Sequence, residues 1–565
     1  MTVSPPKTLK ITATDLPLQK ILSYELGISP IVAQLLINRG IKTVAAGEKF
    51  LDVKLSDLLD PFSFSDMPLA VNFIKKAVKN KEKIMVFGDY DVDGVTSVAL
   101  LENTLEKLGA EVCHYIPHRI NEGYGLSKNI LKICSEKGVK LLVTADCGTN
   151  SATEIKQLRE NNIEVIVTDH HEESCLDTRD YASALINPKV KGSKYKFREL
   201  AGVGVAFKLC QALTGELLER DLDLASLGTI ADSVPLVGEN RVIARHGLKE
   251  IAATNRLGLR TLIEVSGIKD KTITPESVSF ILGPRINASG RLDTAEVALE
   301  LLTTDDPQEA LRLAKLVEGY NRQRQKIESA IMEEAQDLVN QEVNFKQHQV
   351  MVVAKEGWHL GVLGIVASKL ADRFYRPAIL ISVQDGLCRG SGRSIESFHL
   401  FNGLLECESL LDNFGGHSHA IGMVIPQENI DEFRRRINDF ARQTLSSQDL
   451  IPNINVDMEL NLGDLNREFI QDLERLEPFG QGNPEPLFYS RGLWLKGAAR
   501  LYSRETLKFW VTDGKFTYAA IGFGMGNLLE SLSTSQGFDL IYRLKIDRWN
   551  GNESLLLEVE EMLLR

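Results

Sequence analysis

The stretch VFGDYDVDGVTS, residues 86–97, holds three aspartates at alternate positions directly after an apolar run. These residues are Asp89, Asp91 and Asp93. Carboxylates packed so closely repel one another, and burying them without a counter-charge would be very costly. A divalent cation would resolve this conflict, so the spacing of the three aspartates suggests a metal site.

Three later segments offer the same chemistry. LLVTADCG, VIVTDHH and LGTIADSVPL supply, in order, Asp146, Asp169, His170, His171 and Asp232. Carboxylates with one or two imidazoles suit Mn²⁺ or Mg²⁺, and the imidazoles favour Mn²⁺. Cys147 is the one thiol within these motifs, which argues against zinc. A carboxylate such as that of Asp146 can bridge two ions ~3.5–4 Å apart, the two-metal arrangement of phosphoryl chemistry.

The elements around these motifs determine whether the side chains can meet. From Ile84 onward, apolar runs typical of strands alternate with amphipathic runs typical of helices. This alternation predicts an α/β domain with a doubly wound parallel sheet. In such a sheet ligands bind outside the carboxyl ends of the strands. We therefore expect up to six carboxylates and two imidazoles to gather in one crevice.

Each motif taken alone has a plain structural explanation. Aspartate and glycine after a strand are usually turn formers, which is the better interpretation of TADCG by itself. A paired His-His is usually a surface or core feature, and TDHH by itself leaves both interpretations open. Four such motifs in order within one α/β unit make the structural explanation poor, so the combination carries the specificity.

The remainder of the chain predicts further domains. The N-terminal region is typical of short helices and turns, and the polar stretch DPQEALRLAKLVEGYNRQRQKIESAIMEEAQDLVNQ of one or two long connecting helices. Five short strands with turn signals near the C-terminal end suggest a small barrel. The expected parts are a helical N-terminal segment (1–83), a first α/β domain (84–303), a connecting helix (304–346), a second α/β domain (347–446) and an OB-fold-like β-barrel (453–565).

Composition sets limits but decides little about function. The chain has 565 residues, which is too long for one ordinary domain. Its formal net charge of −12 argues only weakly against nucleic-acid binding, because net charge says nothing about local patches. The cysteines show no C-x-x-C spacing, and no apolar run reaches the ~18 residues of a membrane span. We expect a cytoplasmic protein with reduced thiols, no membrane segment and no secretory signal.

Several motifs resemble those of known families. GDYDVDG, TADCG, TDHH and GTIADSVPL resemble the four motifs of the DHH phosphoesterase superfamily. HRINEGYGL, GPRINASGRLDTAE, GWHLGVLGIVASKL, GSGRS, FGGHSHAIGM and LEPFGQGNPEPLF resemble the RecJ family of single-strand-specific exonucleases. That resemblance implies a DHH domain, a DHHA1 domain joined to it by a long helix, and an OB-fold. It also implies degradation of single-stranded DNA from the 5′ end, with release of 5′-mononucleotides, in DNA recombination and repair.

The resemblance implies a role for each residue of the acidic motifs. One ion would be held by Asp91 and Asp146, and a second ion by Asp93, Asp146, His170 and Asp232. The catalytic, ligating or orienting groups beside these ions would be Asp89, Asp169 and His171. Of these, His171 would lie near the scissile phosphate.

The resemblance also implies where the 5′-terminal phosphate is held. Residues 390–393, with the sequence GSGR, would form a small-residue turn that brings backbone N–H groups onto the phosphate. Ser391, Arg393 and Arg119 would contact the phosphate, the guanidinium group of Arg393 in a bidentate manner. His417 would face the same cleft.

Four further residues are candidates for contacts with the strand. Tyr124 would stack on a base, although a buried core position explains a tyrosine there at least as well. Arg285, Asn287 and Arg291, in GPRINASGR, would contact backbone phosphates. A surface ion pair explains either arginine nearly as well.

Two other functions are weighed against the exonuclease. Other DHH enzymes act on pyrophosphate, short oligonucleotides or cyclic dinucleotides, but these enzymes are typically shorter and lack the region from residue 453 onward. A binding protein with an inactive DHH core would lack part of the acidic set, which is complete here. The partners that the resemblance implies are single-stranded DNA, a single-strand-binding protein and a RecQ-like helicase, and we expect a monomer.

Overall fold

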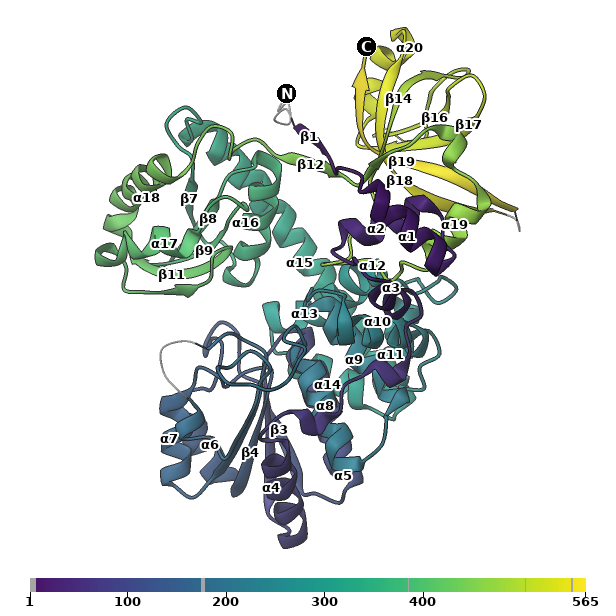
Figure 1. Ribbon diagram of the computed structural model, residues 1–565. Helices are drawn as coiled ribbons and strands as arrows, with labels where there is room; N and C mark the ends of the chain where they lie inside the picture. Colours follow the sequence, from purple (N-terminus) through teal and green to yellow (C-terminus); the bar gives the residue numbers. More distant parts are fainter. Residues whose placement is uncertain (1–6, 174–177, 385, 504, 550–551) are drawn as a thin grey trace. The chain divides into compact units, whose positions relative to one another are not determined.

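The computed structural model describes residues 7–173, 178–384, 386–503, 505–549 and 552–565, and Figure 1 shows it coloured along the chain. These residues divide into two compact units. The larger unit comprises Leu58–Val234 and Val242–Pro452, and the smaller unit comprises Lys7–Asp57, Pro235–Arg241 and Asn453–Arg565.

The first α/β domain of the larger unit is built on a five-stranded parallel sheet of order β3-β2-β4-β5-β6. Its strands are β2 (Lys83–Gly88), β3 (Val112–Tyr115), β4 (Val139–Ala145), β5 (Glu164–Thr168) and β6 (Ala184–Ile186). Helices cover both faces (Figure 1): α6 (Ile130–Lys137) and α7 (Ala152–Glu160) one face, and α4 (Met67–Asn80), α5 (Val92–Lys107) and α8 (Gly202–Thr214) the other. The predicted doubly wound sheet is confirmed, because apolar strands buried on two faces require helices on both.

A helical region follows this sheet and ends in one long helix. Its elements are α9 (Leu222–Ala231), α10 (Gly238–Ala252), α11 (Leu257–Val265), α12 (Pro275–Ser277), the π-helical turn η5 (Val278–Leu282), α13 (Gly283–Leu292) and α14 (Glu296–Thr303). Helix α15 (Pro307–Glu342) then runs unbroken for 36 residues. Asp306 caps its start by accepting from two backbone N–H groups, and a proline occupies the first turn. The connection is therefore one helix, where the sequence allowed one or two.

The second α/β domain has a mixed five-stranded sheet of order β10-β11-β9-β8-β7. Its strands are β7 (Met351–Glu356), β8 (Ala378–Gln384), β9 (Leu387–Arg393), β10 (Asn413–Gly416) and β11 (Ala420–Pro426). One apolar cluster joins the sheet to α15 and α16 (Leu360–Phe374). A second cluster joins it to α17 (Leu400–Leu405) and α18 (Ile430–Thr444). The sheet is thus covered on both faces.

A closed five-stranded barrel forms most of the smaller unit. Around the barrel the strands follow the order β14-β16-β17-β19-β18, and β14 pairs with both β16 and β18. The elements are β12 (Asn453–Val456), β13 (Met458–Glu459), α19 (Arg467–Glu474), β14 (Phe488–Leu495), β15 (Arg500–Leu501), β16 (Thr506–Thr512), β17 (Thr517–Phe523), α20 (Leu529–Thr534), β18 (Phe538–Trp549) and β19 (Asn552–Leu564). This closure confirms the predicted OB-fold-like barrel.

Of the predicted N-terminal segment, Lys7–Asp57 packs against the barrel, whereas α4 belongs to the larger unit. The strand and α-helices of Lys7–Asp57 are β1 (Thr8–Ile11), α1 (Leu16–Leu26), α2 (Pro30–Asn38) and α3 (Val44–Leu51). Leu35 and Leu36 share one apolar core with Phe488 and Phe509 of the barrel. Strand β1 pairs in parallel with β12. Sequence reasoning identified helices and turns here but not this strand, because its partner lies at the other end of the chain.

Hydrogen bonds of Arg241 hold the short segment 235–241 in the smaller unit. Its guanidinium group donates hydrogen bonds to the carbonyl oxygens of Phe50 (3.0 Å), Leu476 (2.9 Å) and Glu477 (2.8 Å). It also lies over the Phe50 ring, 3.8 Å from the centroid. A buried guanidinium surrounded by carbonyl oxygens replaces its lost hydration in this way.

No single helix of the described ranges is both long and apolar enough to cross a bilayer, although the bent pair α1 and α2 together meets the criteria of length and composition.

The contacts of His114 should make the folding stability of the protein depend on pH. Its Nδ1 and Nε2 each lie 2.9 Å from a carboxylate oxygen, of Glu102 on α5 and Glu296 on α14. The hydrogen bond with Glu102, followed by that with Glu296, raises the pKa of His114 to about 10. Because the folded-state pKa lies above the unfolded value, the stabilisation is complete below about pH 6.5 and disappears as the pH rises through 10.

We predict that His114→Gln lowers the unfolding temperature by a few degrees at pH 6.5 and by much less at pH 10.5. Differential scanning fluorimetry at the two pH values measures this. Glu300→Gln, at an exposed position on α14, is the control and should change neither midpoint. An equal loss at both pH values would show that the charge of His114 does not contribute.

Candidate active site

Three neighbouring strands of the parallel sheet end in register. Gly88 of β2 pairs with Ala145 of β4, and Ala145 pairs with Thr168 of β5. The ladder continues one residue further, because the backbone N–H of Asp89 donates to the Ala145 carbonyl (3.3 Å). The N–H of Asp146 likewise donates to the Thr168 carbonyl (3.0 Å). The first residues after the three strands, all aspartates, therefore leave the sheet at one level.

Two helix N-termini hold the other two carboxylates of the first motif. Asp91 caps α5, and its Oδ1 accepts from the N–H groups of Asp93 (3.0 Å) and Gly94 (3.2 Å). The buried carboxylate of Asp93 accepts from the N–H groups of Gly202 (2.6 Å) and Val203 (2.7 Å) at the start of α8. The positive ends of the two helix dipoles thus stabilise these negative charges.

Glycine at position 202 permits this close approach. A Cβ atom there would lie 2.4 Å from Oδ1 of Asp146. Gly228 of α9 is constrained similarly, since its Cβ would lie 2.4 Å from Oγ1 of Thr96 and 3.0 Å from Oδ1 of Asp93. Sequence reasoning did not identify the donors Gly202 and Val203 as part of the site. The signal that could have found them is the glycine-rich start of a predicted helix, AGVGVAFKL.

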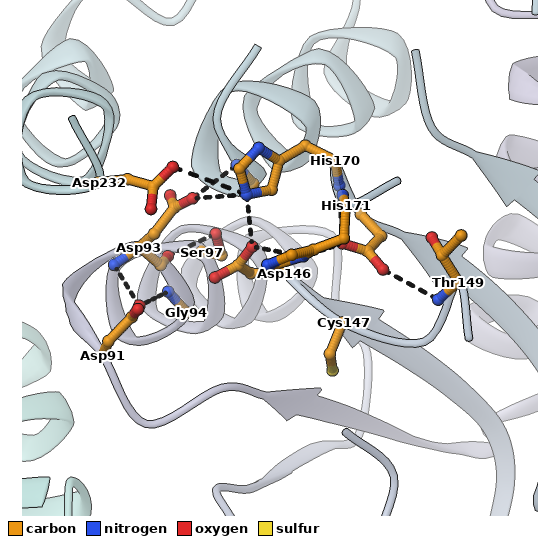
Figure 2. A network of polar contacts seen from close by, with 12 residues as sticks. Asp91, Asp93, Gly94, Ser97, Asp146, Cys147, Thr149, His170, His171 and Asp232 are labelled. Carbon is orange, nitrogen blue, oxygen red and sulfur yellow. Dashed lines mark hydrogen bonds and ion pairs between the residues drawn. The ribbon is translucent and has the colours of Figure 1, made fainter. Parts of the chain in front are cut away.

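His170 is buried among three carboxylates, which point toward its ring in Figure 2. The distances from its Nε2 are 3.2 Å to Oδ1 of Asp146, 3.7 Å to Oδ2 of Asp232 and 3.8 Å to Oδ2 of Asp93. Burial, and next the charge of His171, lower the pKa of His170 to about 3. The ring is therefore neutral at physiological pH and can offer a lone pair to a cation.

Asp169 and His171 form a charged pair beside this cluster. Asp169 accepts from Nδ1 of His171 (2.8 Å) and from the N–H of Thr149 (2.9 Å). Burial alone would raise the pKa of Asp169, but the interactions with His171 lower it. Burial alone would lower the pKa of His171, but the bond to Asp169 raises it to about 9. Asn187 steadies the pair, since its amide donates to Oγ1 of Thr149 (2.8 Å) and to the His171 carbonyl (2.9 Å).

The remaining carboxyl groups are under electrostatic strain. The pKa values of Asp89, Asp93, Asp146 and Asp232 are all raised, first by burial and next by neighbouring carboxylates, and that of Asp93 reaches about 7. Oδ1 of Asp89, Oδ1 of Asp146 and both ring nitrogens of His170 are buried without a hydrogen-bond partner among the described residues. A cation bound among these atoms would satisfy them and neutralise the carboxylates.

Three groups of side chains could each hold an ion, because their ligand atoms lie within 4.8 Å of one another. The groups are Asp89, Asp91 and Asp146; Asp93, His170 and Asp232; and Asp146, His170 and His171. The first two groups overlap the two ligand sets expected from the sequence. Carboxylates with a neutral imidazole fit Mn²⁺ or Mg²⁺. Cys147 points away from the cluster (Figure 2), so thiolate ligation is absent from these groups.

Arginines gather next to the acidic cluster. A cavity of about 230 Å³ is lined by residues of the loop after β3, the first turn of α16, and strands β9 and β11. Arg119 and Ser391 are among the lining residues. Burial and the proximity of Arg119 lower the pKa of Arg393. Both Ser391 and Arg393 lie against Gly364 of α16, where a Cβ would be 3.1 and 3.0 Å from them. The structure thus brings together three of the residues predicted to bind phosphate.

Arg291 connects the arginines with the acidic cluster. Its Nη1 donates to the Gly361 carbonyl at 3.0 Å. Burial, and next the charges of Arg119, Arg324 and Arg393, lower the pKa of Arg291 to about 9, while Asp91 acts in the opposite direction. The guanidinium group therefore lies within electrostatic reach of both positive and negative partners.

Tyr124 and His417 do not belong to the core. The Tyr124 ring is 47% exposed, and its hydroxyl lies 2.8 Å from Nδ1 of His171 and 3.3 Å from the Asp146 carbonyl. The core interpretation of Tyr124 is therefore wrong. His417 lies in the exposed turn between β10 and β11 and is not among the described residues that line the cavity.

Arg285 and Asn287 are engaged in bonds within the protein. Nε of Arg285 pairs with Glu318 (2.7 Å), as in the ion-pair interpretation, and its Nη1 donates to the Ile281 carbonyl (2.7 Å). Oδ1 of Asn287 accepts from the N–H of Val92 (3.2 Å), at the start of α5. Asn287 thus holds the start of α5, which directly follows the acidic loop, in place.

The prediction of a small-residue turn at residues 390–393 is wrong. These residues are part of strand β9, which pairs with β8 and β11. Their glycines serve packing: a Cβ at Gly390 would lie 3.0 Å from Met423, and one at Gly392 would lie 2.9 Å from Ile421. Alternation along the strand then leaves Ser391 and Arg393 on the opposite face.

Comparison with known proteins agrees with these features. Residues 83–231 match the DHH family, N-terminal domain; residues 347–443 match the DHHA1 domain; and residues 456–561 match the RecJ OB domain. The chain is 41% identical, over 96% of its length and 69% of the relative, to the single-stranded-DNA-specific exonuclease RecJ of Bacillus subtilis. It is 34% identical to the enzyme of that name from Dickeya dadantii, over 94% of this chain and 96% of that one.

Solved structures show the same fold. A crystal structure of RecJ from Thermus thermophilus in complex with Mn²⁺ superposes with a TM-score of 0.85 at 29% identity, covering 98% of this chain and 79% of that one. The complex of that protein with Mg²⁺ gives a TM-score of 0.79 over 98% and 78% of the two chains.

Because the carboxylates of the acidic cluster repel one another, we predict that metal reverses which protein is more stable, the wild type or a variant of Asp146. Asp146 has a left-handed backbone with φ of 64°, which asparagine adopts as readily as aspartate. A raised carboxyl pKa means that the folded state is penalised above the unfolded pKa, so Asp146→Asn should raise the metal-free unfolding temperature at pH 7.5 by a few degrees.

With Mn²⁺ present, the order should reverse, because the wild type gains binding energy that the variant loses. Scanning calorimetry with EDTA and then with Mn²⁺ measures both midpoints. Asp223→Asn, at a buried aspartate paired with Arg256 outside the cluster, is the control, and its unfolding temperature should differ from that of the wild type by the same amount in both conditions. Equal responses of Asp146→Asn and the wild type to Mn²⁺ would contradict the site.

Proposed function

We propose that this chain, which belongs to the RecJ family of single-stranded-DNA-specific exonucleases, hydrolyses single-stranded DNA from the 5′ end and releases 5′-mononucleotides. The observation that carries the proposal is the register of three strand ends, which gathers buried carboxylates that need cations. The adjacent arginines supply the complementary charge for a phosphate chain.

Two ions of Mn²⁺ or Mg²⁺ would be held by Asp91, Asp93, Asp146, His170 and Asp232, with Asp89 beside them. When bound, such ions supply Lewis-acid polarisation of a phosphodiester and lower the pKa of a bound water. The chain itself orders the ligands: the N–H groups of α8 fix Asp93, and burial keeps His170 neutral.

His171 would orient the scissile phosphate. Its ring is positively charged at neutral pH, because Asp169 raises its pKa to about 9. Its Nδ1 lies 3.8 Å from Oδ1 of Asp146, so the charge is adjacent to the ligand shared by two of the candidate ion sites. A cation there stabilises negative charge that develops on the phosphoryl oxygens. Asp169 would act through His171 as a positioning residue.

Recognition of the 5′ end would limit cleavage to one nucleotide at a time. Arg119, Ser391 and Arg393 would bind the terminal phosphate, leaving the first internal phosphodiester at the acidic cluster. The half-exposed ring of Tyr124 would stack on the first base. Further contacts with the strand at Arg285, Asn287 and His417 remain predictions.

The barrel would bind the strand through one exposed face. Trp494 and Trp510 are 45% and 54% exposed, and Phe523 is 60% exposed. Lys508 alternates with Trp510 on the outer face of β16. Aromatic rings interleaved with basic groups stack bases and attract the backbone without reading sequence.

The competing functions are less well supported. A small-substrate DHH hydrolase has no use for the barrel face, and an inactive binding protein has no need of the strained carboxylates.

For the intact protein we propose the domain limits 84–303, 347–446 and 453–565, with an N-terminal segment (1–83) and a connecting helix (304–346). We also propose a monomer in the cytoplasm that works with a single-strand-binding protein and a RecQ-like helicase.

Polarity of degradation is the first test. One strand labelled at the 5′ end and one labelled at the 3′ end are incubated with Mn²⁺. We expect immediate release of labelled mononucleotide from the first strand and gradual shortening of the second. Asp146→Asn, which keeps the backbone geometry, should lower the rate by at least ~10³-fold. Intact strands with turnover of dinucleotides or pyrophosphate would support the small-substrate enzyme, and strands bound but never cleaved would support the binding protein.

Removal of one ring tests the barrel face. Trp510→Ala should weaken binding of a long single strand about 5- to 150-fold, because one stacked base contributes ~1–3 kcal/mol. Fluorescence anisotropy in EDTA at two salt concentrations measures the affinity. Tyr24→Ala removes an 85% exposed ring from α1, outside the barrel, and should leave the affinity unchanged. Equal affinities of Trp510→Ala and the wild type would exclude this face.

A further inference from the structure

Strand β9 presents three polar side chains on one face. Arg389, Ser391 and Arg393 occupy alternate positions, so they project to the same side of the sheet at intervals of about 7 Å. Residues 388, 390 and 392 are buried on the other side. Arg389 and Ser391 line the cavity of about 230 Å³ together with Arg119. Sequence reasoning selected Ser391, Arg393 and Arg119 but not Arg389.

Arg389 is poorly compensated in its surroundings. Within the described ranges the structure gives it one hydrogen bond, from Nη1 to the Ile120 carbonyl at 3.2 Å. None of the described residues that line the cavity carries a carboxylate. Two guanidinium groups, those of Arg119 and Arg389, therefore share a cavity with a hydroxyl group and backbone dipoles as the other polar groups. Such a cavity is suited to an anion.

Gly422 keeps the space beside Ser391 open. It pairs directly with Ser391 across β11 and β9, so both face the same side of the sheet. A Cβ built on Gly422 meets nothing within 4 Å, and its φ is not in the left-handed region. Neither packing nor backbone conformation therefore requires glycine at this position. The open space beside Gly422 leaves room for a ligand to approach the strand closely.

We propose that Arg389 is a further specificity-determining residue, which binds the 5′-terminal phosphate monoester of a DNA strand together with Arg119 and Ser391. The inference rests on the proposed exonuclease function and adds a residue to it. A terminal monoester carries more negative charge than an internal diester, so a second guanidinium at this cavity favours 5′-phosphorylated over 5′-hydroxyl ends. The bond to Ile120 holds the guanidinium in place for this contact.

The test compares two otherwise identical strands, with a 5′-phosphate or a 5′-hydroxyl end. For the wild type and Arg389→Gln, kcat and KM are measured on both strands with Mn²⁺. We expect Arg389→Gln to raise KM about 10- to 100-fold for the phosphorylated strand and by less than ~3-fold for the hydroxyl strand. Arg389→Lys, which keeps the charge, should fall between the two. Arg435→Gln removes an exposed guanidinium from the same domain, outside the cavity, and should retain the wild-type ratio.

Binding provides a readout that does not depend on turnover. In the Asp146→Asn background, with EDTA, the affinity ratio of the two strands should fall when Arg389→Gln is added. A merely structural role, through the bond to Ile120, would weaken both strands equally and leave the ratio unchanged, which would overturn the inference. A wild type that does not distinguish the two ends would also overturn it. If the wild type cleaves neither strand, the proposed function fails, and the binding ratio still decides the role of Arg389.

Filling the cavity gives an independent check. Gly422→Val suits a strand and has room for its Cβ, so the unfolding temperature should stay within a few degrees of the wild type. The side chain would occupy the space next to Ser391, and the preference for the phosphorylated strand should fall at least ~10-fold. A folded Gly422→Val variant with the wild-type preference would show that the terminal phosphate binds elsewhere.

Discussion

Repulsion among carboxylates at three aligned strand ends is the constraint on which the rest of the first domain depends. Hydrogen bonds of the parallel ladder fix the backbone of Asp89 and Asp146 one residue beyond the strands, so these side chains cannot separate. The fold therefore relieves the repulsion by other means. Helix N-termini point at Asp91 and Asp93, a protonated His171 neutralises Asp169, and the unpartnered oxygens are left for cations.

The helical elements of this domain follow from the same requirement. Helix α8 begins with glycine because its first N–H groups must reach Asp93 while its backbone passes within contact of Asp146. Asn287 of α13 accepts from the first N–H of α5, and so anchors the end of the acidic loop. Repulsion among the buried carboxylates lowers the stability of the folded protein, but it keeps the metal ligands already in position. The apolar core formed by the strands of the sheet offsets this loss of stability.

The sequence predicted the parts of the fold that depend on local pattern and missed those that depend on distant partners. Apolar runs followed by aspartates predicted the parallel sheet and the acidic crevice, because register follows once neighbouring strands are parallel. Strand β1 could not be found, since its short, exposed run gains its identity only from β12. The GSGR motif was assigned to a turn because glycine usually marks one. Its glycines instead meet Met423 and Ile421 across a sheet, a contact that no local pattern reveals.

Strand β9 shows how a core element can also carry the surface that we propose binds the terminal phosphate. Its buried face needs glycines where neighbouring side chains crowd the sheet, and its other face is thereby free to alternate Arg389, Ser391 and Arg393. Arg393, with Arg119 and Arg291, forms a cluster of positive charges, opposite in sign to the acidic one. Arg291, within electrostatic reach of Asp91, links the two clusters. In the proposed mode of binding, cations at one cluster and phosphates at the other would relieve both repulsions together, so ion binding and strand binding would each strengthen the other.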